Sequence, residues 1–332
     1  MVLLTALIRP VFARFGAPVD IVTSGPWSRP LLAGQPGIGE ILTVRSRKTP
    51  YWLAADQWHV VRRLRARPPG PTWLCDGNDA ADPMLRRARI PAEYVIDVRN
   101  HPRRPGEHTV EQWRRLATAT PPARAASVPA LDAADPAPGC YLAVSDAQRS
   151  DLDAWLRARA IGAAPLLLVQ AGNKRTMRRG PRRLAVNHKY WPEERWAAVI
   201  RFLRERHPTH RVILLGTGPE HGLNEELIAA AGLDGLVNAA DDLPIPRLVA
   251  LLERASGLVT VDSGPAHAAA AVGCPQVVLF GKALPSLYRP WGAPGADVKV
   301  LTGTVDGEPS MLGISVNDVT GAWGSLGLRA AA

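Results

Sequence analysis

The sequence predicts an α/β protein of two domains, each with a parallel sheet covered by helices. The chain has 332 residues, of which 46% are hydrophobic, and this length favours two cores over one. In the second half, short apolar runs alternate with stretches of helical periodicity, which is the element order of a parallel sheet. An Ala- and Pro-rich segment at 118–140 is typical of a linker. We therefore expect domains at 1–145 and 146–332.

The first half has the weaker pattern. Apolar residues from Leu3 to Phe15 recur at helical spacing and predict a helix that ends at Gly16. Such domains normally begin with a central strand, and no strand precedes this helix, so the first strand is missing from the expected pattern. Strands are expected at 19–23, 41–44, 71–74 and 94–97, with a further helix at 57–67.

The second half alternates regularly between strands and helices. Strands are expected at 166–170, 211–215, 236–238, 258–261 and 276–280. Helices are expected at 146–160, 192–207, 223–231, 246–256 and directly after Gly264. Five strands in β-α order predict a Rossmann-type domain, whose ligands bind beyond the carboxyl ends of the strands. From residue 284 onward we expect Gly/Pro turns and a weak final helix.

Composition limits the classes of function. Lys and Arg number 40 against 30 Asp and Glu, and the net charge of +10 favours polyanionic partners such as nucleic acid, phosphates or anionic lipid. The three cysteines lie far apart, which predicts neither a disulfide framework nor a zinc site and fits a reducing cytoplasm. No apolar run reaches the ~20 residues of a membrane span, so we expect a cytoplasmic protein whose membrane contact is at most peripheral.

The sharpest motif is Asp-Ser-Gly-Pro-Ala-His at 262–267, which follows a buried strand. A helix that begins at Gly264 places free N–H groups at the end of that strand, and such a helix start favours an anion, a diphosphate especially. Helix capping explains Asp262 and Ser263 about equally well. It does not explain His267, one turn into the helix. Both interpretations stay open from the motif alone.

A cationic loop runs from the end of strand 166–170 to the helix at 192–207 and faces the same crevice. Charge runs usually belong to solvated loops, and that explanation holds for its arginines taken singly. Lys189 differs, because Trp191-Pro192 fixes the helix start beside it and holds the ammonium near the crevice. The loop supplies a possible anion-binding group of Lys174, Arg175, Arg178 and Arg179.

A Gly-rich strand end, Gly216-Thr-Gly218, is followed by Glu220. A carboxylate in this position either accepts hydrogen bonds from ribose hydroxyls, as in dinucleotide folds, or compensates a helix dipole. The histidines share no spacing that predicts a metal site, and the sequence lacks a P-loop and a nucleophile elbow. The ten Trp residues are scattered, which disfavours nucleic-acid binding despite the charge.

Together these motifs resemble glycosyltransferase family 9, the lipopolysaccharide heptosyltransferases and their relatives. The resemblance implies the GT-B fold of two facing Rossmann-like domains, with the acceptor on the side of 1–145 and the donor on that of 146–332. It is weaker over 3–9, 20–25 and 30–34. It is strong over 165–292, through Lys189-Tyr-Trp-Pro192, Gly218-Pro-Glu220, the motif at 262–267, Leu279-Phe-Gly281 and Pro290-Trp-Gly292.

The resemblance also implies a function and a set of binding residues. The function is metal-independent, inverting transfer of a heptose or related sugar from an ADP-sugar to a lipopolysaccharide core or similar anionic glycolipid, with no cofactor. The implied partners are the nucleotide-sugar donor and that acceptor, with peripheral contact at the inner membrane and no nucleic acid. The implied donor contacts are Lys189 for phosphate, Glu220 for ribose, Leu243 for the base, Asp262 for the sugar, and Ser263, Gly264 and His267 for the diphosphate.

One feature departs from the family pattern. The family supplies its catalytic base from a Gly-Asp just before the stretch that matches Val2–Ile8, and that Gly-Asp is absent. We assign no catalytic residue, since the settings of Asp20, Asp76 and Asp97 do not recommend them. The expected explanation is a start site placed too late. The alternatives are a non-catalytic relative that binds sugar nucleotides or glycans and, less favoured, a GT-B epimerase.

Overall fold

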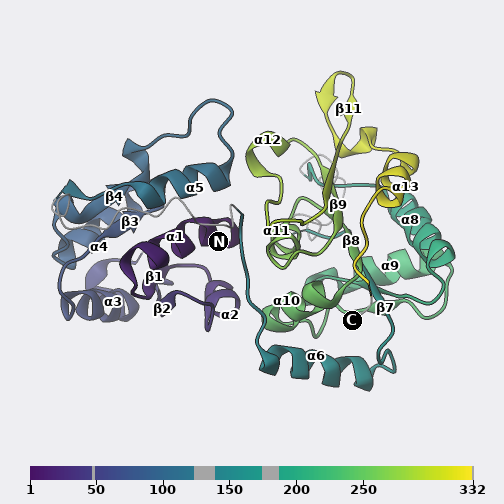
Figure 1. Ribbon diagram of the computed structural model, residues 1–332, viewed down its shortest axis with the longest axis horizontal. Coiled ribbons are helices and arrows are strands. Elements are labelled where there is room, and N and C mark those ends of the chain that lie inside the picture. Colours follow the sequence, from purple (N-terminus) through teal and green to yellow (C-terminus); the bar gives the residue numbers. More distant parts are fainter. Residues whose placement is uncertain (47–48, 123–138, 174–186, 331–332) are drawn as a thin grey trace. The chain divides into compact units, whose positions relative to one another are not determined.

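Figure 1 shows a computed structural model of the protein, which describes residues 1–46, 49–122, 139–173 and 187–330. The contacts within the chain divide it into two units. One unit holds Met1 and residues 3–136, and the other holds Val2 and residues 137–332. The domain boundary expected between residues 145 and 146 falls inside the second unit, directly before its first helix.

The first unit contains two pairs of parallel strands. β1 (Val19–Thr23) pairs with β2 (Ile38–Thr43), and β3 (Thr72–Leu74) pairs with β4 (Val95–Asp97). All four strands overlap the expected ones. The helices are α1 (Thr5–Phe15), α2 (Ser28–Leu32), α3 (Ala55–Arg65), α4 (Asp82–Arg87) and α5 (Thr109–Thr118). The sequence analysis missed α2, α4 and α5.

The core of the first unit forms where α1 packs on α5. Leu7 and Val11 of α1 contact Leu116 of α5 in one buried cluster. Arg14, buried near the end of α1, donates hydrogen bonds to the carbonyls of Ala117 and Ala119 at 3.0 and 2.9 Å. A guanidinium therefore satisfies carbonyls at the C-terminal end of α5 that lack partners within the helix.

The second unit is built on a six-stranded parallel sheet in the order β10-β9-β8-β5-β6-β7. The sequence analysis expected five of these strands and missed β10, which is only partly buried and follows a Gly/Pro-rich segment. It also missed the hairpin of β11 (Thr304–Val305) and β12 (Glu308–Pro309). The sheet strands are β5 (Leu166–Gln170), β6 (Arg211–Leu214), β7 (Val237–Asn238), β8 (Gly257–Val261), β9 (Gln276–Phe280) and β10 (Val298–Thr302).

Helices cover both faces of this sheet (Figure 1). On one face, Leu167 and Val169 of β5 join a buried cluster with residues of α8, α9 and α13, including Trp196 and Trp323. On the other face Phe280 packs against Ala266 of α11. The helices are α6 (Asp146–Ala158), α8 (Glu193–Arg206), α9 (His221–Ala231), α10 (Ile245–Arg254), α11 (Gly264–Ala271), α12 (Pro285–Tyr288) and α13 (Val316–Gly324). Within the described ranges, no helix is both long and apolar enough to cross a membrane.

Candidate functional site

The order of strands in the second unit locates the edge of its sheet at which such folds bind ligands, and we call this point the crevice. From β5 the chain proceeds outward through β6 to β7, then returns to place β8 on the other side of β5. Ligands of open parallel sheets bind outside the carboxyl ends of the strands at such a reversal. β5 ends at Gln170 and β8 at Val261, so Gly172 and Asp262 follow directly at this point. Both lie in the segments that the sequence analysis singled out.

The first turn of α11 opens onto this point. Ser263 is the N-cap, and its hydroxyl accepts a hydrogen bond from Ala266 N at 3.4 Å. The same hydroxyl donates to Oε1 of Gln170 at 3.3 Å, which links the helix start to the end of β5. A Cβ at Gly264 would meet nothing within 4 Å, so the space before the turn is open. As the first helical residue, Gly264 has an N–H group with no partner in the helix.

Three side chains with complementary chemistry meet beside this turn. Lys189 Nζ lies 2.8 Å from Oδ2 of Asp262 and donates a hydrogen bond to the Asp262 carbonyl at 2.5 Å. His267 Nε2 lies 3.9 Å from Oδ1 of Asp262. The Lys189 side chain is 35% exposed and that of Asp262 10%. The ammonium therefore remains accessible from solvent while its carboxylate partner is largely covered.

The main chain around Lys189 is held on both sides. Lys189 N donates to Oδ1 of Asn187 at 3.2 Å, and the Lys189 carbonyl accepts from Nδ2 of Asn173 at 3.4 Å. Next along the chain, Trp191 is buried, and its indole N–H donates to the Ile314 carbonyl at 2.9 Å. The Lys-Tyr-Trp-Pro motif thus anchors the lysine through a buried tryptophan, as its place before a helix suggested.

Two glycines of the quoted motifs are required by close backbone approaches. A Cβ at Gly281, after β9, would lie 1.9 Å from the His188 carbonyl oxygen. A Cβ at Gly292 would lie 1.6 Å from the carbonyl oxygen of Ala270 in α11. Real Cβ atoms do not approach backbone this closely, so only glycine fits at either position. Gly281 therefore lets the segment that carries Lys189 lie against the end of β9.

Glu220 has a structural role of its own. It ends the short helix η7 (Gly218–Glu220), and its Oε2 accepts hydrogen bonds from both N and Oγ1 of Thr217 at 2.8 Å. This is a capping box, so the carboxylate satisfies a helix start. Its other oxygen points to the chain after β5, since a Cβ at Gly172 would lie 2.3 Å from Oε1. One carboxylate oxygen of Glu220 thus borders the crevice.

The remaining predicted residues are placed less closely. Leu243 lies between β7 and α10 and is half-buried. In the parts of the chain that are described, no group of three His, Cys, Asp or Glu side chains is placed to hold a metal ion. The predicted anion-binding loop residues Lys174, Arg175, Arg178 and Arg179 lie outside the described residues.

The sequence analysis missed two polar residues that shape the site. Gln170 is buried at the end of β5 and accepts hydrogen bonds from the hydroxyls of Ser263 and Thr260, at 3.3 and 3.5 Å. Asn187 is 3% exposed and fixes the Lys189 main chain. An amide that ends a wholly apolar strand was the available signal for Gln170. Asn187 gave no such signal, because it stands in a polar run, Asn187-His188-Lys189, where an amide is ordinary.

Comparisons with known proteins now identify the family. A family model described as glycosyltransferase family 9 (heptosyltransferase) matches residues 84–302. The protein belongs to this family. Among curated members, lipopolysaccharide heptosyltransferase 2 of Escherichia coli K12 is 28% identical over 118 residues, which cover 35% of this chain and 33% of the relative. The chain thus matches about a third of the length of that relative.

Solved structures share the fold over nearly the whole chain. The E. coli ADP-heptose LPS heptosyltransferase II superposes with a TM-score of 0.70 at 19% identity, covering 98% of this chain and 94% of the other. A family 9 glycosyltransferase from Veillonella parvula gives a TM-score of 0.75 at 16% identity, with coverage of 98% and 92%. The expected GT-B fold class, with parallel sheets in an α/β arrangement, is confirmed.

Proposed function

We propose that the protein transfers a heptose or related sugar from an ADP-sugar to a lipopolysaccharide core or similar glycolipid, with inversion and without a metal. The observation that carries the proposal is the pair of Lys189 Nζ and Asp262 Oδ2, 2.8 Å apart at the open first turn of α11. Membership in the heptosyltransferase family supports it, as does the ADP-heptose named for the solved E. coli relative.

The crevice offers one group for each part of such a donor. Lys189 and the Gly264 N–H at the start of α11 attract the diphosphate, because an ammonium and the positive end of a helix both favour negative charge. Oε1 of Glu220, beside Gly172, is placed to accept from the ribose. The full proposed set is Lys189, Ser263, Gly264 and His267 for the diphosphate, Asp262 for the sugar, Glu220 for the ribose and Leu243 for the base, with the loop of Lys174, Arg175, Arg178 and Arg179 as a further anion contact.

In the proposed glycosyl transfer, the leaving group ADP must be stabilised. The acceptor hydroxyl oxygen forms a bond to the anomeric carbon, the bond from that carbon to the diphosphate oxygen breaks, and the hydroxyl proton passes to a base. Negative charge then develops on the departing ADP. In this proposal Lys189 and the Gly264 N–H bind the departing diphosphate, and such fixed donors stabilise a transition state more than water does. We assign the base to none of the residues in the crevice.

The acceptor belongs, in this proposal, to the side of the first unit. The net charge of +10 favours an anionic glycolipid, whose phosphates attract a basic surface. We place the reaction at the cytoplasmic face of the inner membrane, where a cytoplasmic sugar nucleotide would meet a glycolipid acceptor.

Thermal denaturation with and without donor tests the proposal. At about 100 times its Kd, ADP-heptose or ADP-mannose adds about 2.7 kcal/mol of stability, which is roughly 5 °C in Tm. Lys189→Ala removes this shift. The matched control is Lys299→Ala, because Lys299 Nζ also pairs with an aspartate, Asp297, at 3.0 Å, but at the start of β10 and away from the crevice. We expect that variant to keep the full shift.

Product analysis completes the test. Transfer to a lipopolysaccharide-core acceptor should release ADP, continue in the presence of a chelator and invert the anomeric configuration. Indifference of the Tm to every nucleotide sugar would reject the donor site. A shift without transfer would instead indicate the non-catalytic binding relative.

A further inference from the structure

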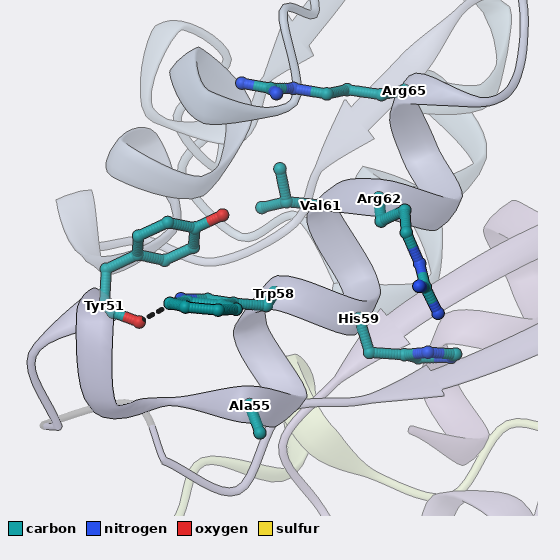
Figure 2. A pocket seen from close by; sticks show the side chains of 7 residues that line it. All are labelled: Tyr51, Ala55, Trp58, His59, Val61, Arg62 and Arg65. Carbon is teal, nitrogen blue, oxygen red and sulfur yellow. Dashed lines mark hydrogen bonds between the residues drawn. The ribbon is translucent and has the colours of Figure 1, made fainter.

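The first unit carries an exposed aromatic and basic surface that the proposed donor site does not use. It lies on the short helix η2 (Tyr51–Leu53) and on α3, around a hollow of about 430 Å³ (Figure 2). The side chains that line the hollow include Tyr51, Trp58 and Arg62. We call the surface of η2 and this side of α3 the η2–α3 surface.

Large apolar side chains on this surface face solvent. Trp52 is 70% exposed, Leu53 61% and Trp58 51%. Single exposed apolar residues are ordinary, but three large ones within seven positions concentrate apolar surface in one short segment, and exposed apolar patches mark binding surfaces. Trp52 and Leu53 do not line the hollow. A ligand that only filled the hollow would therefore leave them uncovered.

The aromatic rings are held in fixed positions. The Trp58 indole donates a hydrogen bond to the Tyr51 carbonyl at 2.5 Å, and the two ring centroids lie 6.0 Å apart (Figure 2). On Tyr51 rests Arg87 from α4, whose Cζ is 4.3 Å from the ring centroid. Because the rings are already ordered, a partner that covers them loses little side-chain entropy on binding.

α3 divides its arginines between two sides. Arg63, near its end, and Arg67, two residues beyond it, pair with Glu40. Arg62 and Arg65 lie three positions apart and line the hollow with Trp58. Among the described residues neither of these two has a carboxylate partner, and Arg65 donates only to the Arg87 carbonyl, at 2.7 Å. Their charges thus remain available to an external anion.

The acidic residue of α3 does not neutralise this side. Asp56 accepts hydrogen bonds from the Ser46 hydroxyl and from the N–H groups of Arg45 and Ser46. The Ser46 hydroxyl is the main cause of a pKa near 2 for this carboxyl group. The Asp56 carboxylate is therefore bonded at the N-terminus of α3 to the segment that follows β2, and it does not pair with Arg62 or Arg65.

We propose that the η2–α3 surface docks the protein on a bilayer that contains anionic lipid. Trp52, Leu53 and Trp58 lie at the headgroup level, where tryptophan is enriched in membrane-bound proteins, and Arg62 and Arg65 contact lipid phosphates. The positive charges of Arg62 and Arg65 favour anionic lipid over neutral lipid as the partner. The proposal goes beyond the donor site and depends on none of its residues.

Vesicle co-sedimentation tests the proposal with the full chain. Vesicles of phosphatidylglycerol and phosphatidylethanolamine should retain the protein, with retention falling as salt rises, and phosphatidylcholine vesicles should not. Removal of one arginine charge near a surface weakens partitioning about fivefold, so Arg62→Glu should weaken it by at least that factor. Trp52→Ser should give a loss of similar size. Neither residue is buried, so both variants should keep the wild-type Tm.

Matched controls lie in the second unit. Leu284→Ser removes another exposed apolar side chain, at 57% exposure, and Arg157→Glu reverses another exposed charge. Both should bind vesicles like the wild type. Equal losses in Arg62→Glu and Arg157→Glu would overturn the proposal, because net charge alone would then explain binding. Retention of Trp52→Ser at wild-type level, or binding of a soluble anionic saccharide without vesicle binding, would overturn it too.

The Tm shift with ADP-sugar is measured on the same variants. We expect Trp52→Ser and Arg62→Glu to keep the full Tm shift with ADP-sugar although they bind vesicles more weakly. Failure of the proposed function removes the shift and leaves vesicle binding intact, so the two failures are distinguishable.

Discussion

The two units differ in how their strands are buried. Every residue of β5, β8 and β9 is buried, because helices cover both faces of that sheet. In the first unit, β1 and β4 alternate buried residues with partly covered or exposed ones. Ion pairs occur in both units, such as Arg115 with Glu107 at 2.7 Å in the first and Arg247 with Asp151 at 2.8 Å in the second, so they do not distinguish the two. The proposed donor crevice therefore rests on a packed core, and the η2–α3 surface on a shallower one.

Truncation of a core leucine gives the largest expected difference. Leu168→Ala in β5 should cost about 4–5 kcal/mol of unfolding free energy, because the fully buried site has little room to collapse. Leu74→Ala in β3, where the leucine is 7% exposed, should cost about 2–3 kcal/mol. Urea unfolding of both variants measures this. An equal loss of unfolding free energy in Leu168→Ala and Leu74→Ala would contradict the difference between the units. As a control, Leu312→Ala, at an exposed position, should have an unfolding free energy within about 0.5 kcal/mol of wild type.

Added methyl groups on glycine test rigidity in each unit. Gly292→Ala meets the Ala270 carbonyl, a backbone atom, and should cost about 3 kcal/mol or more. Gly25→Ala in the first unit meets the ring of Trp27 at 2.6 Å, but that ring is 44% exposed and free to turn outward. We expect a cost below about 1 kcal/mol there. Differential scanning calorimetry gives both values, and a large drop in Tm for Gly25→Ala would contradict a pliant first unit.

The smallest expected difference is the pH at which each unit loses stability on acidification. Burial, with the charges of His210 and Arg206, holds the pKa of His207 below 6.5, and its neutral Nε2 accepts from the Trp323 indole at 3.0 Å. That stability is complete above about pH 6.5 and is lost as pH falls through the lowered pKa. Glu107, held by Arg115, has its pKa lowered from 4.5 to about 2, so its contribution is lost only between those values.

The second unit should therefore lose stability first on acidification. Thermal unfolding between pH 7 and pH 3 checks the order, and His207→Gln should flatten the response that begins below pH 6.5 without affecting the one governed by Glu107. If the first unit, which holds Glu107, lost stability before the second, the predicted order would be wrong.

The success of the sequence predictions followed the strength of local signals and did not follow the division into units. β5 and β1 were located with their observed bounds, and the start of α11 was located at Gly264, because apolar runs and a cap are local signals. β10 escaped, since an edge strand buries only part of each residue. α5 escaped although His108 forms a capping box with Glu111, because histidine is an unusual cap residue.

The sequence named residues that the structure brings together, but it did not predict their contacts, and their role at a donor stays a prediction. The motifs located Lys189 and Asp262, which lie 73 positions apart, and family resemblance placed both at a donor. Their ion pair and the close approach of Gly281 to His188 depend on how β8 and β9 neighbour each other, which no local pattern encodes. The capping role of Glu220 was anticipated only as a competing interpretation.

The ion pair between Lys189 and Asp262 has a consequence for turnover under the proposed function. A diphosphate that enters must share the ammonium with a carboxylate only 2.8 Å away, so phosphate alone gains little. A complete sugar nucleotide offers Asp262 hydroxyl groups as new partners and so compensates for the shared charge. Once the sugar has left, ADP again competes with the carboxylate. Under the proposed function, Asp262 would thus promote the release of ADP from Lys189, and inhibition by the product would be weak.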